Sequence, residues 1–185
     1  IGLYSGKKVN MKMLPASIDS GIVFSVSGKK IKATYNNVTE TNRRTIISNS
    51  SLEIHTIEHL MSALYFCNIT NIIIEMDSFE PPIMDGSAVE FVDCINNVGV
   101  IKQNKNILPI VIDRKITYEV PSKDSYVTAL PYDGFKLTYV IDYPLCNSIR
   151  NEQFSIDILF GENHYEKIVS ARTFCLATEL LDLNK

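Results

Sequence analysis

The chain has 185 residues, of which 45% are hydrophobic and 21% are charged, and its formal net charge is −3. This composition is typical of a globular protein, and the mild negative charge without a long basic run argues against a nucleic-acid-binding face. Because no apolar run approaches the roughly 20 residues that a membrane-spanning helix needs, we expect no transmembrane segment.

The first half of the chain predicts short strands, then two helices with a strand between them. The strands are expected where polar and apolar residues alternate, at 8–14, 21–27, 30–34 and 44–48. A helix begins near Thr56, which is expected to cap it. Its apolar face is formed by residues at helical spacing, namely Ile57, Leu60, Met61 and Leu64.

The apolar run NIIIEM at 71–76 predicts a strand buried on both faces. Pro81 and Pro82 then interrupt regular structure, and a second helix follows, capped by Ser87 or Asp85. This helix is expected to end at Gly99. Its apolar face is Val89, Phe91, Val92 and Ile95.

The polar, aperiodic stretch 102–106 is the best candidate for a linker, and we place a domain boundary near Asn104. The first domain is therefore 1–104 and the second 105–185. After the linker, strands are expected at 116–120, 125–130 and 135–143, a helix near Glu162, and another over 176–183. The two halves of the chain thus share an order, with strands first and a helix later.

Glu58 and His59 are adjacent polar residues at the start of the first predicted helix. A neutral imidazole is a common zinc ligand, and a carboxylate beside the metal can act as general base toward bound water. Adjacent helical residues point about 100° apart, so the two side chains would flank an ion rather than chelate it together. A solvated polar face with a hydrogen-bonded histidine explains the same dipeptide.

Two further segments stand out, PPIMDGSAVEF at 81–91 and SARTF at 170–174. The first reads structurally as a Pro-stiffened loop, a tight turn and a helix cap. In the second, Thr173 is able to donate a hydrogen bond to an oxyanion, although ordinary packing accounts for it equally well. His55 is expected at a strand end and His164 on the surface.

Taken in order, these segments resemble the UDP-3-O-acyl-N-acetylglucosamine deacetylase family, the zinc-dependent deacetylases of lipid A (lipopolysaccharide) biosynthesis. The matching stretches are GLYSGKKV, ETNRRT, TIEHLMSAL, NIIIEMDSFEPPIMDGSAVEFVD and SARTF, which cover essentially the whole chain. The resemblance implies two small α+β domains, each a two-layer arrangement with helices packed between the two sheets. The second domain would be incomplete here.

The resemblance also implies roles for individual residues. His59 matches a zinc ligand, Glu58 the general base, and Thr173 a residue that stabilises the oxyanion. Phe174 matches a residue near the mouth of the acyl-chain passage. Asp142 and Tyr143 fall where the family binds the uridine of its substrate. Asp85-Gly86-Ser87 matches a motif that supports the site without taking part in the chemistry.

The family takes its two other zinc ligands from an H-K-x-x-D helix and a general acid from a later histidine. This sequence has three histidines and no such motif, so we expect it to be the N-terminal portion of a longer enzyme.

The expected reaction removes the N-acetyl group from a UDP-linked 3-O-acylated glucosamine, which gives acetate and the free amine. We expect a monomeric, cytoplasmic protein whose four cysteines are reduced, with no nucleic-acid partner but with peripheral contact to acyl chains. Two alternatives stay open: a metal-free module that binds a nucleotide sugar, and a zinc amidohydrolase with another acyl-amide substrate.

Overall fold

The structure of the protein, a computed structural model, describes residues 1–143, 149–158 and 166–176. Within these residues the expected α+β class is confirmed, because several small sheets occur together with three α-helices. Spatial contacts divide the chain into two compact units. The first unit is Ile1–Lys105 with Glu166–Lys185, and the second unit is Asn106–Tyr165. The domain boundary near Asn104 stays a prediction.

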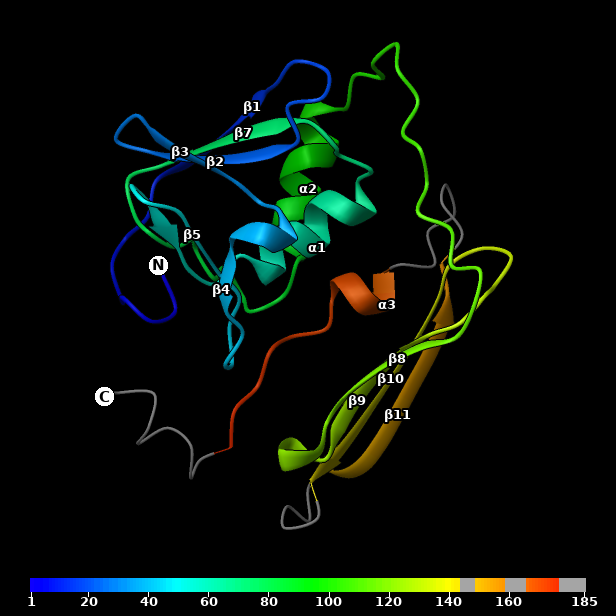
Figure 1. Ribbon diagram of the computed structural model, residues 1–185. Coiled ribbons are helices and arrows are strands. Elements are labelled where there is room, and N and C mark those ends of the chain that lie inside the picture. Colours follow the sequence, from blue (N-terminus) through cyan, green and yellow to red (C-terminus); the bar gives the residue numbers. More distant parts are fainter. Residues whose placement is uncertain (144–148, 159–165, 177–185) are drawn as a thin grey trace. The chain divides into compact units, whose positions relative to one another are not determined.

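The first unit holds two sheets and the three α-helices (Figure 1). The strands of the larger sheet lie in the order β1-β7-β2-β3, and those of the smaller sheet in the order β4-β5-β6. The elements are β1 (Met11–Pro15), β2 (Ile22–Val26), β3 (Lys29–Lys32), a 3₁₀ turn (Tyr35–Asn37), β4 (Val38–Glu40), β5 (Ile46–Ser48), β6 (Glu53–Ile54), α1 (Glu58–Phe66), β7 (Ile72–Met76), α2 (Val89–Val98) and α3 (Glu166–Val169).

The core of this unit lies between the larger sheet and the helices α1 and α2. Strands β2 and β7 run parallel, with Phe24 opposite Ile74, and both side chains are fully buried. The helices lie on one face of this sheet (Figure 1). The prediction that β7 is buried on both faces is wrong, because Glu75 is exposed and Ile73 only partly buried. The strand alternates, as expected when one face of a sheet meets the core.

Both long helices are followed by a residue with a positive φ, and the second ends at Gly99 as predicted. Helix α1 is followed by Asn68 at a φ of 57°, and the amide of Ile69 donates to the carbonyl of Leu64 at 2.8 Å. This is the left-handed termination that Asn and Gly favour. Helix α2 ends at Gly99, with a φ of 85°. In the described part of the chain, none of the helices combines the length and apolarity that crossing a bilayer requires.

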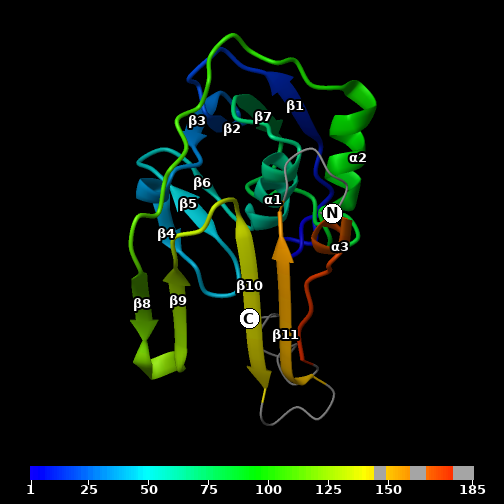
Figure 2. The ribbon, with the colours of Figure 1, turned by 90° about the vertical axis from the view of Figure 1, so that its right-hand side faces the viewer.

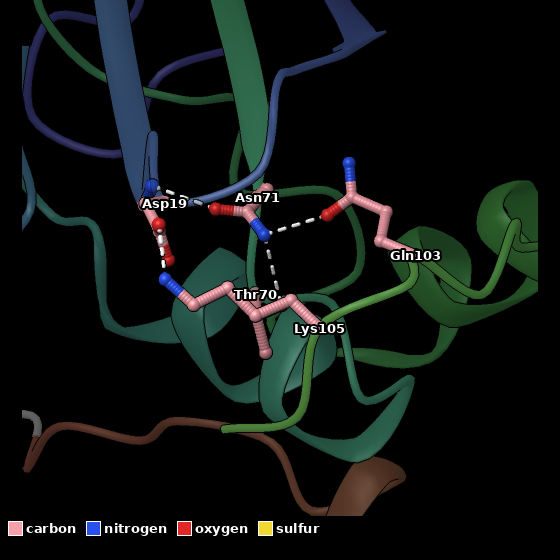
Figure 3. A network of polar contacts seen from close by, with 6 residues as sticks. Asp19, Thr70, Asn71, Gln103 and Lys105 are labelled. Carbon is pink, nitrogen blue, oxygen red and sulfur yellow. Dashed lines mark hydrogen bonds and ion pairs between the residues drawn. The ribbon is translucent and has the colours of Figure 1, made fainter. Parts of the chain in front are cut away.

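The residues after α2 are bound to the loops at one end of β1, β2 and β7 in the larger sheet (Figure 3). The side-chain amide of Asn71 donates to Gln103 Oε1 at 2.7 Å, and its oxygen accepts from the Gly21 amide at 2.9 Å. Gln103 in turn donates to the carbonyl of Ala16 at 2.9 Å. Lys105 forms an ion pair with Asp19. Part of the stretch predicted as a linker is therefore bound to the first unit.

The described residues of the second unit form two antiparallel strand pairs, β8 with β9 and β10 with β11 (Figure 2). Their bounds are Ile116–Val120 for β8, Ser125–Ala129 for β9, Lys136–Tyr143 for β10 and Arg150–Asp157 for β11, with a 3₁₀ turn at Pro121–Lys123. The predictions of β8, β9 and β10 are confirmed, whereas β11 was not predicted from its polar sequence. The helix expected near Glu162 is described from Glu166 onward, as α3 of the first unit. Most of the helix expected over 176–183 lies outside the described residues.

Candidate active site

Glu58 and His59 are the first two residues of α1, and both are partly exposed. The Glu58 carboxylate is held in place, because its Oε2 accepts a hydrogen bond from the backbone amide of Thr45 at 2.9 Å. A carboxylate in the first turn of a helix is also favoured by the helix dipole. The chain therefore presents an oriented carboxylate next to an accessible imidazole.

Thr56, just before this helix, does not cap it as predicted. No side-chain cap is present at the N-terminus of α1, and Thr56 instead has a φ of 53°. A β-branched residue rarely adopts this left-handed conformation, and strain of this kind concentrates at functional sites. Thr56 is 4% exposed, and within the described residues its Oγ1 has no hydrogen-bond partner. The strained residue lies two positions from Glu58.

The loop Asp85-Gly86-Ser87 is fixed by its own hydrogen bonds. Asp85 Oδ1 accepts from the Ser87 hydroxyl at 2.6 Å and from the Ser87 amide at 2.9 Å, and these bonds lower the pKa of the Asp85 carboxyl. Ser87 Oγ also accepts from the amide of Val89, the first residue of α2, at 3.2 Å. Ser87 thus contributes to the helix start, although the N-cap position itself is occupied by Ala88.

This loop also holds the segment SARTF. The amide of Thr173 donates to the carbonyl of Gly86 at 2.9 Å, and the amide of Ala88 donates to the carbonyl of Val169 at 3.0 Å. Gly86 has a φ of 87°, a conformation that other residues rarely adopt. The side chains of Thr173 and Phe174 are exposed, and α3 packs against α1. The loop thus anchors the backbone of Thr173, and the supporting role implied for the motif stays a prediction.

The zinc ion implied by the resemblance can be tested against the donor groups in the structure. His59 fits as one ligand, because it is partly exposed and its imidazole is a normal zinc donor. A catalytic zinc site needs three protein ligands, and the described residues contain no group of three or more His, Cys, Asp or Glu side chains placed to hold a metal. The described residues therefore fit one ligand position and not a complete site.

Asp142 and Tyr143, the predicted uridine-binding residues, belong to the second unit. They end strand β10, opposite Asn151 and Arg150 of β11. Their roles stay predictions, as do those of Glu58, His59, Thr173 and Phe174.

Of the other two histidines, His55 and His164, the structure describes His55. His55 directly follows β6, as expected, and its Nε2 lies 2.6 Å from Glu53 Oε1. His164 lies outside the described residues.

The sequence assigned no individual role to Thr45, Tyr4 or Glu80. Thr45 holds the Glu58 carboxylate through its backbone, so its side chain gave no signal. Tyr4 stacks on Arg44, whose guanidinium carbon is 4.3 Å from the ring centroid. Glu80 is a carboxylate with 3% exposure. The stretches GLYSGKKV and ETNRRT did mark Tyr4 and Thr45 as part of the resemblance, but not what they contact.

Comparison with known proteins agrees with the motifs and their arrangement. Residues 1–185 match the family model described as LpxC, UDP-3-O-acyl N-acetylglycosamine deacetylase. A UDP-3-O-acyl-N-acetylglucosamine deacetylase of Thermodesulfovibrio yellowstonii is 40% identical over 178 residues, covering 94% of this chain and 59% of the relative. Proteins of the same name from Syntrophus aciditrophicus (37% identity, 94% and 55% covered) and Hahella chejuensis (39%, 94% and 58%) are similar. The chain thus spans just over half the length of these relatives, and it belongs to the LpxC deacetylase family.

Proposed function

We propose that this chain is part of a zinc-dependent hydrolase that removes the N-acetyl group from a UDP-linked 3-O-acylated glucosamine in lipid A biosynthesis. Membership of the LpxC family supports the substrate and the reaction. The observation that carries the proposal is the anchored carboxylate of Glu58, held at 2.9 Å by the Thr45 amide beside the accessible His59. The products would be acetate and the free amine.

In this mechanism Glu58 acts as the general base. Its carboxylate takes a proton from the attacking water, and the bond to Thr45 leaves Oε1 available for that transfer. His59 would hold the zinc ion, which when bound supplies Lewis acidity and lowers the pKa of coordinated water. The hydroxyl of Thr173, on a backbone anchored to Gly86, would donate to the oxygen that becomes negative as the carbonyl is attacked.

The substrate's other parts would be bound by residues beyond the Glu-His pair. Asp142 and Tyr143 would contact the uridine, where the Tyr143 ring supplies a stacking face. Phe174, which is 53% exposed, would line the entrance to the acyl-chain passage. We also propose the family's two-domain arrangement, with helices packed between the two sheets, and a monomeric, cytoplasmic enzyme.

The proposal is tested in the full-length protein by replacing Glu58 with Ala. Turnover of the UDP-sugar substrate should fall by about a hundredfold to ten-thousandfold, as loss of a general base does, while bound zinc measured by mass spectrometry stays at the wild-type level. His59→Ala should lower both zinc content and turnover. Glu75→Ala, on the exposed face of β7, serves as the control. Unchanged turnover in the Glu58 variant would contradict the assigned role, and a zinc-free active preparation would contradict the metal dependence.

A further inference from the structure

The Glu58 carboxylate depends on the backbone around Thr45 for its orientation. The Thr45 amide donates to Glu58 Oε2 at 2.9 Å, and the Thr45 carbonyl accepts a longer contact of 3.5 Å from the amide of Ile57. Thr45 therefore touches the start of α1 at two points. A shift of the Thr45 backbone would move the Glu58 carboxylate, because Oε2 is hydrogen-bonded to the Thr45 amide.

Arg43 and Arg44, the two residues before Thr45, contact the side chain of Tyr4. The guanidinium carbon of Arg44 lies 4.3 Å from the centre of the Tyr4 ring, a distance at which cation–π attraction acts. The Tyr4 hydroxyl donates to the carbonyl of Arg43 at 3.4 Å. Arg43 itself has a φ of 59°, so this turn adopts a strained conformation that contacts from outside must maintain.

Tyr4 is in turn held by the buried carboxylate of Glu80. Glu80 is 3% exposed, and its two oxygens accept from the amides of Ser5 at 2.6 Å and Tyr4 at 3.3 Å. Gly2 lies directly against the same carboxylate. A Cβ at this position would lie 2.1 Å from Glu80 Oε1, so there is no room for a side chain. Charge-assisted bonds from backbone amides to a carboxylate are among the stronger hydrogen bonds in proteins.

The electrostatic surroundings of Tyr4 agree with this arrangement. Burial raises the pKa of the Tyr4 hydroxyl, the positive charge of Arg44 opposes the rise, and the negative charge of Glu58 adds to it.

We propose that Tyr4 and Arg44 are positioning residues for the general base, acting on Glu58 through the Thr45 backbone, with Glu80 holding Tyr4 in place. This inference rests on the proposed function, because it concerns the same carboxylate. None of the three residues needs to touch the substrate. Their contribution is to keep the carboxylate in the orientation from which it can accept a proton, and misplacing a reacting group by about 1 Å can lower the rate about a hundredfold.

The experiment compares kcat and KM of variants of the full-length enzyme. Arg44→Met keeps the apolar stem and removes the guanidinium, and Tyr4→Leu removes the ring. Both should lower kcat between about tenfold and a hundredfold while KM and zinc content stay within about twofold of wild type. Arg44→Lys and Tyr4→Phe, which retain a cation and a ring, should recover most of the loss. Matched controls are Arg114→Met and Tyr35→Leu, both at exposed positions.

Coupling to Glu58 separates positioning from a merely structural role. In the Glu58→Ala background, Arg44→Met should have little further effect on turnover, because the group it positions is gone. An equal loss of kcat in both backgrounds would overturn the proposal, as would a parallel fall of kcat, zinc content and melting temperature in all four variants. If Glu58→Ala itself leaves turnover unchanged, the proposed function fails. If Glu58→Ala is inactive but Arg44→Met and Tyr4→Leu retain wild-type kcat, the inference alone fails.

Discussion

The two units of the chain bury their apolar side chains to very different extents. In the first unit Phe24, Leu60 and Leu64 are fully buried, whereas in the second unit Tyr118 and Tyr139 are 71% and 62% exposed. Among the described residues of the second unit, Ile158 is the one hydrophobic residue counted as buried. Among the described residues, the first unit therefore has a hydrophobic core, whereas the strands of the second unit bury few of their apolar side chains. Isolated two-stranded pairs are marginal in water, so stability should be unevenly distributed along this chain.

The largest expected effect is a difference in amide hydrogen exchange between β7 and β8. In the 185-residue chain, amides of Ile72–Met76 should open only with the core of the first unit, and those of Ile116–Val120 by local fraying. Exchange of β8 should therefore be faster by on the order of a thousandfold, measured by mass spectrometry of peptides. Equal protection of the two strands would break the comparison.

Truncating one apolar side chain in each unit should give a smaller but clear contrast. Leu64→Ala removes a fully buried side chain and should lower the free energy of unfolding by about 2–5 kcal/mol. Val140→Ala changes a residue that is 52% exposed and should alter it by about 0.5 kcal/mol or less. Urea titrations followed by circular dichroism report both. A large loss from Val140→Ala would show that the second unit has a cohesive core of its own.

The smallest expected effect is a gain in stability at Thr56. Its buried Oγ1 lacks a hydrogen-bond partner within the described residues, and an unsatisfied buried polar group costs about 1–3 kcal/mol. Thr56→Val keeps the shape, removes the hydroxyl and should raise the free energy of unfolding by about 1 kcal/mol. Ser48→Val, at a partly exposed position outside the core, is the control. A loss of stability in Thr56→Val would mean that the hydroxyl has a partner.

The sequence predicted the elements whose signals are local. One helical face was predicted to hold Ile57, Leu60, Met61 and Leu64. Met61 is partly buried and the other three are buried. Gly99 was expected to end the second helix and does so. Alternation identified β1, β2, β3, β8 and β9, because the period of two directly reflects a pleated backbone, whereas the short strands β4 and β6 were not predicted. β11 was not predicted, because its sequence, RNEQFSID, is mostly polar and the strand is defined by its pairing with β10.

The surroundings of the candidate site were less predictable for a physical reason. Thr56 was expected to cap α1, a rule based on preferences of extended backbone, but the chain adopts a left-handed conformation there. The contact between Thr45 and Glu58 spans 13 residues, and that between Ser5 and Glu80 spans 75. Such bonds form between loops brought together by the tertiary fold, and no periodicity in either segment encodes them. Family motifs marked these loops, whereas only the structure shows what they contact.

The contacts of Gln103 and Lys105 have a consequence for where the connection between the two units begins. Although α2 ends at Val98, the backbone is tied down again through the side chains of Gln103 and Lys105. The segment that connects the two units therefore begins beyond Lys105, several residues after the end of α2. A shorter connecting segment raises the effective concentration of the groups that it joins. The side-chain amide of Asn71, which donates to Gln103, therefore helps to set where this connection begins.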